Sequence, residues 1–183
     1  MKFKRALINL KYLLFPEDYL EKLTARGLKL GKNLNIQKGV IIDDSHCWHI
    51  SIGNNVTLAP YVHILAHDAS TKEFTGYTKV GKVDIGNSVF IGASSIVLPG
   101  TIIGDNVIIG AGSVVSIDIP SNSVAVGNPA KVIGTVTEFI ERKKKEMEKF
   151  PLFDESYTVG QYVSQEKRIF MNETMKDRFG YIR

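Results

Sequence analysis

Four histidines are the side chains of this 183-residue chain best suited to acid–base chemistry: His46, His49, His63 and His67. Asp43 and Asp44 come shortly before His46, and Asp68 directly follows His67. An imidazole with an ordinary pKa of about 6.5 can take a proton from an attacking hydroxyl group and pass it to a leaving group near neutral pH. These residue types therefore predict proton-transfer chemistry, and the elements around them decide which histidine performs it.

Aliphatic residues recur with a period of six through the middle of the chain. They stand at Ile52, Leu58 and Ile64, then at Ile85, Ile91, Val97, Ile103, Ile109 and Val115, with a fainter set at Leu30, Ile36 and Ile42. Gly or another small residue usually follows each one. A period of six fits neither a helix of 3.6 residues per turn nor a hairpin meander. It is typical of a solenoid of short strands.

Three faces of about six residues make a triangular coil of about 18 residues. We therefore expect inward side chains to stack on equivalents 18 residues away, Ile85 on Ile103 and Val97 on Val115. The glycines fall at the corners, where the chain turns, and asparagines such as Asn87 follow them, as suits turns. The predicted fold is mainly β, a parallel β-helix.

The period breaks at two places, and both contain histidine. After Ile64 the next inward aliphatic residue is Ile85, and the segment 67–82, HDASTKEFTGYTKVGK, is polar. We predict that this segment leaves the solenoid as an excursion loop, the kind of place where function tends to lie. The earlier break is DDSHCWH, residues 43–49.

Both ends of the chain lie outside the repeat. We expect residues 1–28 to form a helical cap, because apolar residues from Phe3 to Leu14 recur at helical spacing. The predicted β-helix then covers residues 29–134, with a last strand at Val132-Ile133. Residues 135–183 are expected to form a helix over 137–150 and a packed tail, with a short helix around Gln165–Met171.

Composition excludes several classes of protein. The net charge of +4 is too small and too scattered to indicate a nucleic-acid partner. The basic run at residues 142–145 is interleaved with glutamates and is typical of a solvated helix face. No stretch approaches the roughly 20 apolar residues of a membrane span. The single cysteine, Cys47, excludes an intrachain disulfide, and this fits a cytoplasmic location.

The chain from about Ile52 to Ile133 resembles the hexapeptide-repeat acyltransferases, and among them the maltose and galactoside O-acetyltransferases. IGNNVTLAPYVHILAHD resembles the coil that ends at the family's catalytic histidine, and the stretch from VDIGNSVF to GNPAKVIG resembles the half that binds acyl-CoA. The resemblance implies a left-handed parallel β-helix, acetyl-CoA as co-substrate, no required metal, and a homotrimer with its active sites between subunits. It also implies an acceptor hydroxyl on a sugar or glycan, as in polysaccharide modification.

The resemblance assigns roles residue by residue. His67 matches the general base. Phe90 stands where relatives often have Trp, as a wall against the acyl chain or the pantetheine. The Ala93 backbone, beside Gly92, matches the donor to the thioester oxygen, an oxyanion contact worth roughly 3 kcal/mol. The pantetheine contacts implied are Ala111, with Gly112 beside it, and Ser116, and Lys131 in NPAKVI matches a basic residue near the adenosine phosphates.

The acceptor side departs from the family. DDSHCWH replaces the region where the galactoside enzyme has an acceptor-contacting Asn, so its sugar specificity does not transfer. The acceptor-binding residues that we predict are Asp43, Asp44, His46 and Asp68.

Other functions remain open on the same scaffold. One is N-acetylation of an amino sugar or transfer to serine, and another is a non-catalytic binding module. A metal site made of the four histidines is a further alternative. Their spacing does not match that of the metal-dependent carbonic anhydrases that share the solenoid.

Overall fold

The computed structural model describes residues 16–158, 160–175 and 179–183. It divides into two compact units, residues 1–136 and 137–183. The amphipathic helix predicted from Phe3 to Leu14 lies outside the described residues. No helix in the described ranges is long and apolar enough to cross a membrane.

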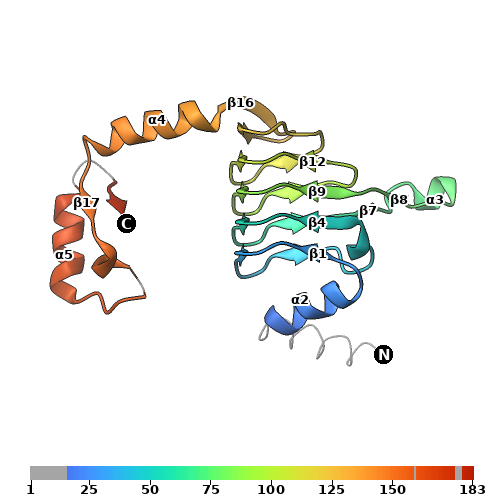
Figure 1. Ribbon diagram of the computed structural model, residues 1–183, viewed down its shortest axis with the longest axis horizontal. Helices are drawn as coiled ribbons and strands as arrows, with labels where there is room; N and C mark the ends of the chain where they lie inside the picture. The colour runs from blue at the N-terminus through green and yellow to red at the C-terminus, as the bar shows by residue number, and fades with distance from the viewer. Residues whose placement is uncertain (1–15, 159, 176–178) are drawn as a thin grey trace. The chain divides into compact units, whose positions relative to one another are not determined.

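The first unit is a stack of coils made of very short strands (Figure 1). It begins with α2 (Pro16–Ala25), and the strands of the first coils are β1 (Lys29–Leu30), β2 (Asn35–Ile36), β3 (Ile41–Ile42), β4 (Ile50–Ile52), β5 (Thr57–Leu58) and β6 (His63–Ile64). The later coils contain β9 (Val83–Ile85), β10 (Phe90–Ile91), β11 (Ile96–Val97), β12 (Ile102–Ile103), β13 (Ile108–Ile109), β14 (Val114–Val115), β15 (Ser123–Val126) and β16 (Lys131–Thr135).

Successive strands lie on three different sheets in rotation. Face A has the order β1-β4-β9-β12, face B has β2-β5-β10-β13-β15-β16, and face C has β3-β6-β11-β14. All pairs on these faces are parallel except β15–β16, which closes the last coil as an antiparallel pair. The chain therefore winds round three sides and has three edges, which we call the A–B, B–C and C–A edges.

The strand register confirms the predicted stacking. Ile85 pairs with Ile103, Ile91 with Ile109, and Val97 with Val115. These six inward side chains are at most 3% exposed, so each coil buries its apolar row against the next coil, as in other solenoids. Neighbouring coils pack so closely that a Cβ on Gly92 would lie 2.4 Å from the backbone nitrogen of Ala111.

Two insertions interrupt the 18-residue coil without disturbing this register. Ile42 pairs with Ile64, 22 residues on, because the chain makes a short 3-10 helix, η1 (Cys47–His49), before β4. Ile64 pairs with Val97, 33 residues on, because an excursion leaves the stack. The excursion is a hairpin of β7 (His67–Asp68) and β8 (Lys79–Val80) with the helical turn α3 (Lys72–Thr75) at its tip, and it projects from the solenoid (Figure 1).

Helix α2 covers the first coil and is tied to β3. The Tyr19 hydroxyl donates to the carbonyl of Ile42 at 2.7 Å, and burial raises the pKa of Tyr19 to about 12. Leu23 of α2 and Cys47 of η1 are fully buried together, with the thiol 3.6 Å from the Leu23 carbonyl oxygen. The helix end therefore supports the segment that contains the first break.

The second unit consists of α4 (Val136–Met147, of which Val136 belongs to the first unit), β17 (Leu152–Phe153), η2 (Glu155–Tyr157), α5 (Gln165–Thr174) and β18 (Tyr181–Ile182). β17 and β18 pair in parallel, and the Tyr181 hydroxyl donates to Glu146 Oε1 at 2.6 Å. The rings of Phe150 and Phe179 stack at 4.2 Å. The C-terminal strand β18 is thus bonded to helix α4.

Candidate active site

His67 stands where the solenoid first opens. It follows β6 after Leu65 and Ala66, at the C–A edge, and is the first residue of β7. The antiparallel pairing of His67 with Val80 fixes the base of the hairpin. The His67 side chain is 36% exposed, so its imidazole is held by the fold and can still meet a substrate.

Asp43 lies directly beneath His67 and holds its ring. The residue follows β3, and its backbone N–H donates to the Ile64 carbonyl at 2.8 Å, which places it one coil below Leu65. Its carboxylate is buried, and Oδ2 accepts from the Ala66 N–H at 3.0 Å and bonds His67 Nδ1. Oδ1 accepts from the Ser45 hydroxyl at 2.7 Å.

The hydrogen bonds of Asp43 decide its charge. Burial raises the pKa of the Asp43 carboxyl, but its hydrogen bonds to His67, to Ser45 and to a backbone N–H outweigh burial and hold that pKa below its usual range. An ionised carboxylate can only accept, so we assign the hydrogen between the two groups to His67 Nδ1. Neutral His67 then has its lone pair on Nε2, the tautomer that a general base requires.

This arrangement favours a role for Asp43 that differs from the one predicted from the sequence. The sequence predicts an acceptor-binding residue, whereas the structure buries the carboxylate behind the imidazole, with both oxygens hydrogen-bonded. The four extra residues of the first break cause the difference, since they shift the register so that residue 43 lies under residue 65.

His46 lies beside His67 in a small cluster of aromatic rings. The two imidazole centroids are 4.9 Å apart, and the Trp48 and His49 rings lie 5.3 Å and 6.4 Å from that of His46. Trp48 packs beside Gly27, where an added Cβ would lie 2.9 Å from the Trp48 Cβ. The first break therefore presents its rings around His67.

Asp43, His46 and His67 together could also hold a metal ion. One donor atom from each lies within 4.8 Å of the others, and no further such group occurs in the described ranges. Two imidazoles and a carboxylate are a ligand set typical of zinc. The oxygens of Asp43 already accept N–H and O–H hydrogen bonds, and a metal on His67 Nδ1 would have to displace its hydrogen. Hydrogen bonding alone accounts for the arrangement.

The other two predicted acceptor residues are exposed aspartates near the base. Asp44 follows Asp43 at the surface, and Asp68 follows His67 in β7. Asp68 Oδ1 accepts from the Ser70 N–H at 2.8 Å, and this bond lowers the pKa of Asp68. Asp68 thus shapes the start of the hairpin and carries a negative charge beside His67.

Most predicted acyl-donor residues gather at the B–C edge. Gly92 and Ala93 follow β10 there, and the next coil places Ala111 and Gly112 against them, with the Gly112 N–H donating to the Ala93 carbonyl at 2.8 Å. The backbone N–H groups of Ala93 and Ala111 make no hydrogen bond within the described residues.

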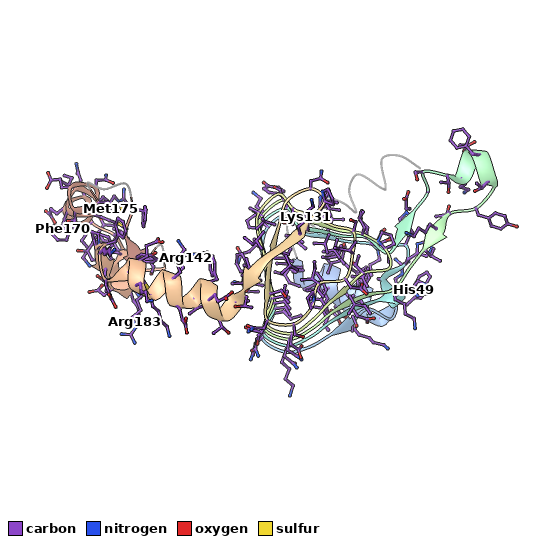
Figure 2. All side chains as sticks on the ribbon, turned by 90° about the horizontal axis from the view of Figure 1, so that it is seen from above. His49, Lys131, Arg142, Phe170, Met175 and Arg183 are labelled. Atoms are coloured by element: carbon purple, nitrogen blue, oxygen red, sulfur yellow. The ribbon has the colours of Figure 1, made fainter. Side chains whose placement is uncertain are left out.

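Three other predicted donor contacts lie around that edge or away from it. Phe90 is 45% exposed and lies in β10, shortly before the chain reaches the B–C edge. Lys131 of β16 pairs with Val126 of β15 in the last coil. Viewed from above the stack, Lys131 lies at a different edge from His49 (Figure 2). Ser116 follows β14 at the C–A edge, the edge of His67, so the structure separates it from Ala93 and Ala111. In one chain, the base and the predicted oxyanion donor therefore lie at different edges.

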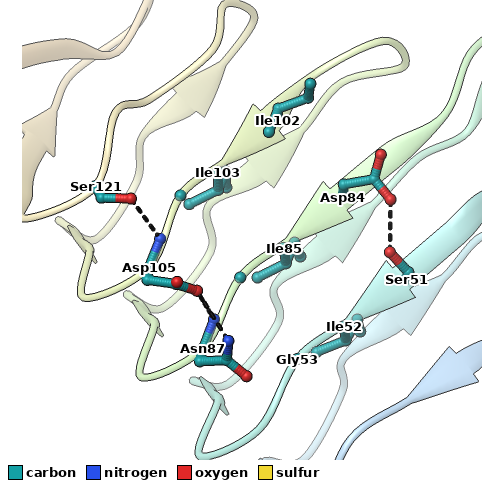
Figure 3. Close-up of a pocket in the computed structure, with 12 residues that line it drawn as sticks. Ser51, Ile52, Gly53, Asp84, Ile85, Asn87, Ile102, Ile103, Asp105 and Ser121 are labelled. Atoms are coloured by element: carbon teal, nitrogen blue, oxygen red, sulfur yellow. Dashed lines mark hydrogen bonds between the residues drawn. The ribbon is translucent and has the colours of Figure 1, made fainter.

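A shallow groove of about 430 Å³ runs over face A and the A–B edge (Figure 3), and His67 is not among its lining residues. Its polar groups bond one another: Ser51 Oγ donates to Asp84 at 2.5 Å, the Asn87 N–H donates to Asp105 at 2.5 Å, and the Asp105 N–H donates to Ser121 Oγ at 3.0 Å. These hydrogen bonds form a row that connects successive coils.

Comparison with known proteins identifies the family. Residues 82–116 match the family model described as bacterial transferase hexapeptide (six repeats). A solved maltose O-acetyltransferase from Clostridium difficile is 34% identical, with a TM-score of 0.50 over 67% of this chain and 87% of that one. The chain belongs to the hexapeptide-repeat acyltransferases. This membership confirms the predicted left-handed parallel β-helix.

Two further proteins are similar to this chain over most of its length. A galactoside acetyltransferase solved in complex with coenzyme A is 31% identical, with a TM-score of 0.54 over 74% of this chain and 62% of that one. Protein CapG of Staphylococcus aureus is 33% identical over 183 residues, which are 96% of this chain and 99% of that protein. Seven curated relatives with acetyltransferase in their names are matched over 29% to 68% of their own length.

Proposed function

We propose that this protein transfers an acetyl group from acetyl-CoA to a hydroxyl group of a sugar or glycan, with His67 as the general base. The observation that carries the proposal is the buried Asp43 carboxylate bonded to Nδ1 of a half-exposed imidazole. The galactoside and maltose acetyltransferases among the relatives support the reaction class, and the coenzyme A complex supports the donor.

The proposed reaction is a direct transfer without a covalent enzyme intermediate. The acceptor oxygen attacks the thioester carbonyl while His67 Nε2 takes the hydroxyl proton. The tetrahedral intermediate then expels the CoA thiolate, which takes the proton back from His67. Asp43 holds the ring and stabilises the imidazolium that exists between the two proton transfers. We therefore infer that Asp43 is a positioning residue.

On the donor side, we propose that backbone groups of the B–C edge bind the acyl-CoA. The Ala93 N–H, which makes no hydrogen bond within the described residues, is suited to the oxyanion, and Ala111 and Gly112 to the pantetheine. Ser116, at the C–A edge, is a further proposed pantetheine contact. Phe90 would form the wall of the acyl site and Lys131 the contact with the phosphates. Asp44 and Asp68 remain our proposed contacts for the acceptor.

We further propose a homotrimer, because the base and the donor residues of one chain lie at different edges. Face C supports this association, since its outward positions Ile41, His63, Ile96 and Val114 are aligned in register, with Ile41 47% exposed. An apolar row of this kind marks an association surface. A neighbouring copy would then bring its B–C edge to His67.

The test is the substitution His67→Ala, assayed by CoA release with a panel of hydroxyl and amino acceptors. We expect kcat/KM to fall by about 10²–10⁴, the usual contribution of a general base. His49→Ala is the matched control, because the His49 side chain is a half-buried neighbour that accepts from Trp48 and, within the described residues, makes no hydrogen bond to Asp43 or His67; it should retain activity. Activity of His67→Ala within about tenfold of wild type would contradict the base assignment. Faster transfer to amines would overturn the O-acetyltransferase proposal.

A further inference from the structure

The Ser45 hydroxyl connects two imidazoles to one carboxylate. Its oxygen lies 2.7 Å from Asp43 Oδ1, 3.0 Å from His46 Nδ1 and 3.3 Å from His67 Nδ1. Ser45 has a single hydroxyl hydrogen, and the ionised Asp43 is both the nearest and the strongest acceptor for it. The lone pairs of Ser45 can then only accept, so the hydrogen between Ser45 and His46 belongs to His46 Nδ1.

This hydrogen-bond order puts both histidines in the same tautomer. His67 donates from Nδ1 to Asp43, and His46 donates from Nδ1 to Ser45, so each neutral ring has its lone pair on Nε2. His46 Nε2 accepts no hydrogen bond within the described residues. His49 differs, because its Nε2 accepts from the Trp48 indole N–H at 3.1 Å.

The two imidazole rings that carry these acceptors lie side by side. The ring centroids of His46 and His67 are 4.9 Å apart with an interplanar angle of 38°, and both rings are partly exposed. Two hydroxyl groups on neighbouring carbons suit a pair of rings this close, with each hydroxyl donating a hydrogen bond of about 2.7–2.8 Å to one Nε2. An isolated hydroxyl group would leave one of the two nitrogens unpaired.

We propose that His46 recognises a second hydroxyl group of the acceptor, adjacent to the hydroxyl that His67 deprotonates. The substrate class is therefore a vicinal diol, such as two neighbouring hydroxyl groups of a pyranose ring. The second hydroxyl donates to His46 Nε2 and is not acetylated. This inference rests on the proposed function and adds to it the feature by which the acceptor is chosen.

Two substitutions at His46 separate its two nitrogens. His46→Asn keeps a donor near the position of Nδ1 for Ser45 and removes Nε2, whereas His46→Gln places an acceptor near the position of Nε2. The probes are methyl glucoside and methyl galactoside, each compared with its monodeoxy derivatives by CoA release. His49→Asn is the matched control, because its Nε2 is already paired.

We expect wild type and His49→Asn to prefer the diol over the derivative that lacks the neighbouring hydroxyl by about fivefold to tenfold, the effect of one neutral hydrogen bond. His46→Asn should lose that preference while its kcat/KM with the deoxy acceptor stays within about twofold of wild type, and His46→Gln should restore it. An equal loss on both acceptors in His46→Asn would overturn the inference and reveal a purely structural role.

A second measurement is independent of turnover. Nitrogen-15 NMR of the histidine side chains should show His46 and His67 protonated at Nδ1 when neutral. Protonation of His46 at Nε2 would overturn the inference. If wild type acetylates no sugar of the panel, the proposed function fails, and this inference fails with it. If it acetylates diols and deoxy acceptors equally, the inference alone fails.

Discussion

At the scale of residues, Asp43 decides what His67 can do. A neutral imidazole that exchanges between its two tautomers would have the lone pair on Nε2, where it can meet the substrate, only part of the time. The buried carboxylate, held by the Ala66 N–H and Ser45, removes that freedom before any substrate arrives. In catalytic triads the group behind the histidine has the same effect.

The substitution Asp43→Asn tests this role. The amide can donate to His67 Nδ1 and so favour the wrong tautomer, and we expect kcat/KM to fall at least about 10²-fold. Asp84→Asn, an exposed aspartate of face A, is the matched control and should stay near wild type. Activity of Asp43→Asn near that of wild type would show that the tautomer is set by something else.

The same variant has a signature in its pH dependence. The pKa of Asp43 is lowered in the folded protein, so its charge contributes stability above the unfolded pKa of about 3.9, and this contribution is lost as pH falls through the lowered value. Urea unfolding at pH 7, 5, 4 and 3 should show the difference in stability between wild type and Asp43→Asn narrowing below about pH 4. A constant difference would contradict an ionised Asp43.

The sequence identifies His67 as the candidate base, but it does not identify Asp43 as the hydrogen-bond partner of His67. His67 stands where a clear period of six ends. Asp43 stands in a segment of acidic and aromatic residues whose register depends on how many residues the first insertion removes from the coil. Only the pairing of Ile42 with Ile64 shows that residue 43 lies under the base.

At the scale of elements, close stacking of the coils makes glycine necessary at the corners. A Cβ on Gly92 would lie 2.4 Å from the Ala111 nitrogen and 2.8 Å from its Cα, both backbone atoms of the next coil. Gly112, one coil on at the same edge, has φ +69° and nothing within 4 Å of an added Cβ. The two glycines therefore have different physical requirements.

This contrast predicts different costs for two alanine substitutions. Gly112→Ala should cost about 1–2 kcal/mol, the strain of a left-handed residue. Gly92→Ala should cost more, because the coils themselves must move apart. Denaturant unfolding measures the free energy of unfolding of both variants. An equal or smaller decrease in Gly92→Ala would show that neighbouring coils can move apart at little cost.

The strands on the three faces could be predicted because inward side chains repeat every six residues. The hairpin of β7 and β8 could not, because Lys79 and Val80 lie in a polar segment with no inward row to read. The strands β7 and β8 pair because the neighbouring coils hold the two ends of the excursion close together.

At the scale of the whole molecule, the residues of the proposed site are divided between two edges of the β-helix. His67 and Ser116 belong to the C–A edge, and Ala93 and Ala111 to the B–C edge. In the homotrimer that we propose, each site lies between two subunits, and a single chain would hold only half of it. This is the part of the candidate site that no single-chain pattern can supply.

Mixed oligomers test the division. His67→Ala and Ala93→Trp chains should each be inactive alone, the second because the large ring fills the donor edge. Refolded together in equal amounts, they should regain about a quarter of wild-type activity, because random assembly pairs an intact base edge with an intact donor edge at one site in four. Light scattering should give about three times the chain mass of 20.3 kDa. A monomeric mass, or a mixture that stays inactive, would contradict sites between chains.

The excursion hairpin leaves the stack and returns without changing the register of the coils on either side. Its length is therefore a nearly free variable, since doubling a loop costs only about 0.6 kcal/mol in closure entropy. Insertions and deletions there can accumulate during evolution while the base, its carboxylate and the donor edge stay in place. One solenoid can in this way serve many acceptors, with new selectivity arising from a loop whose length does not alter the register of the coils.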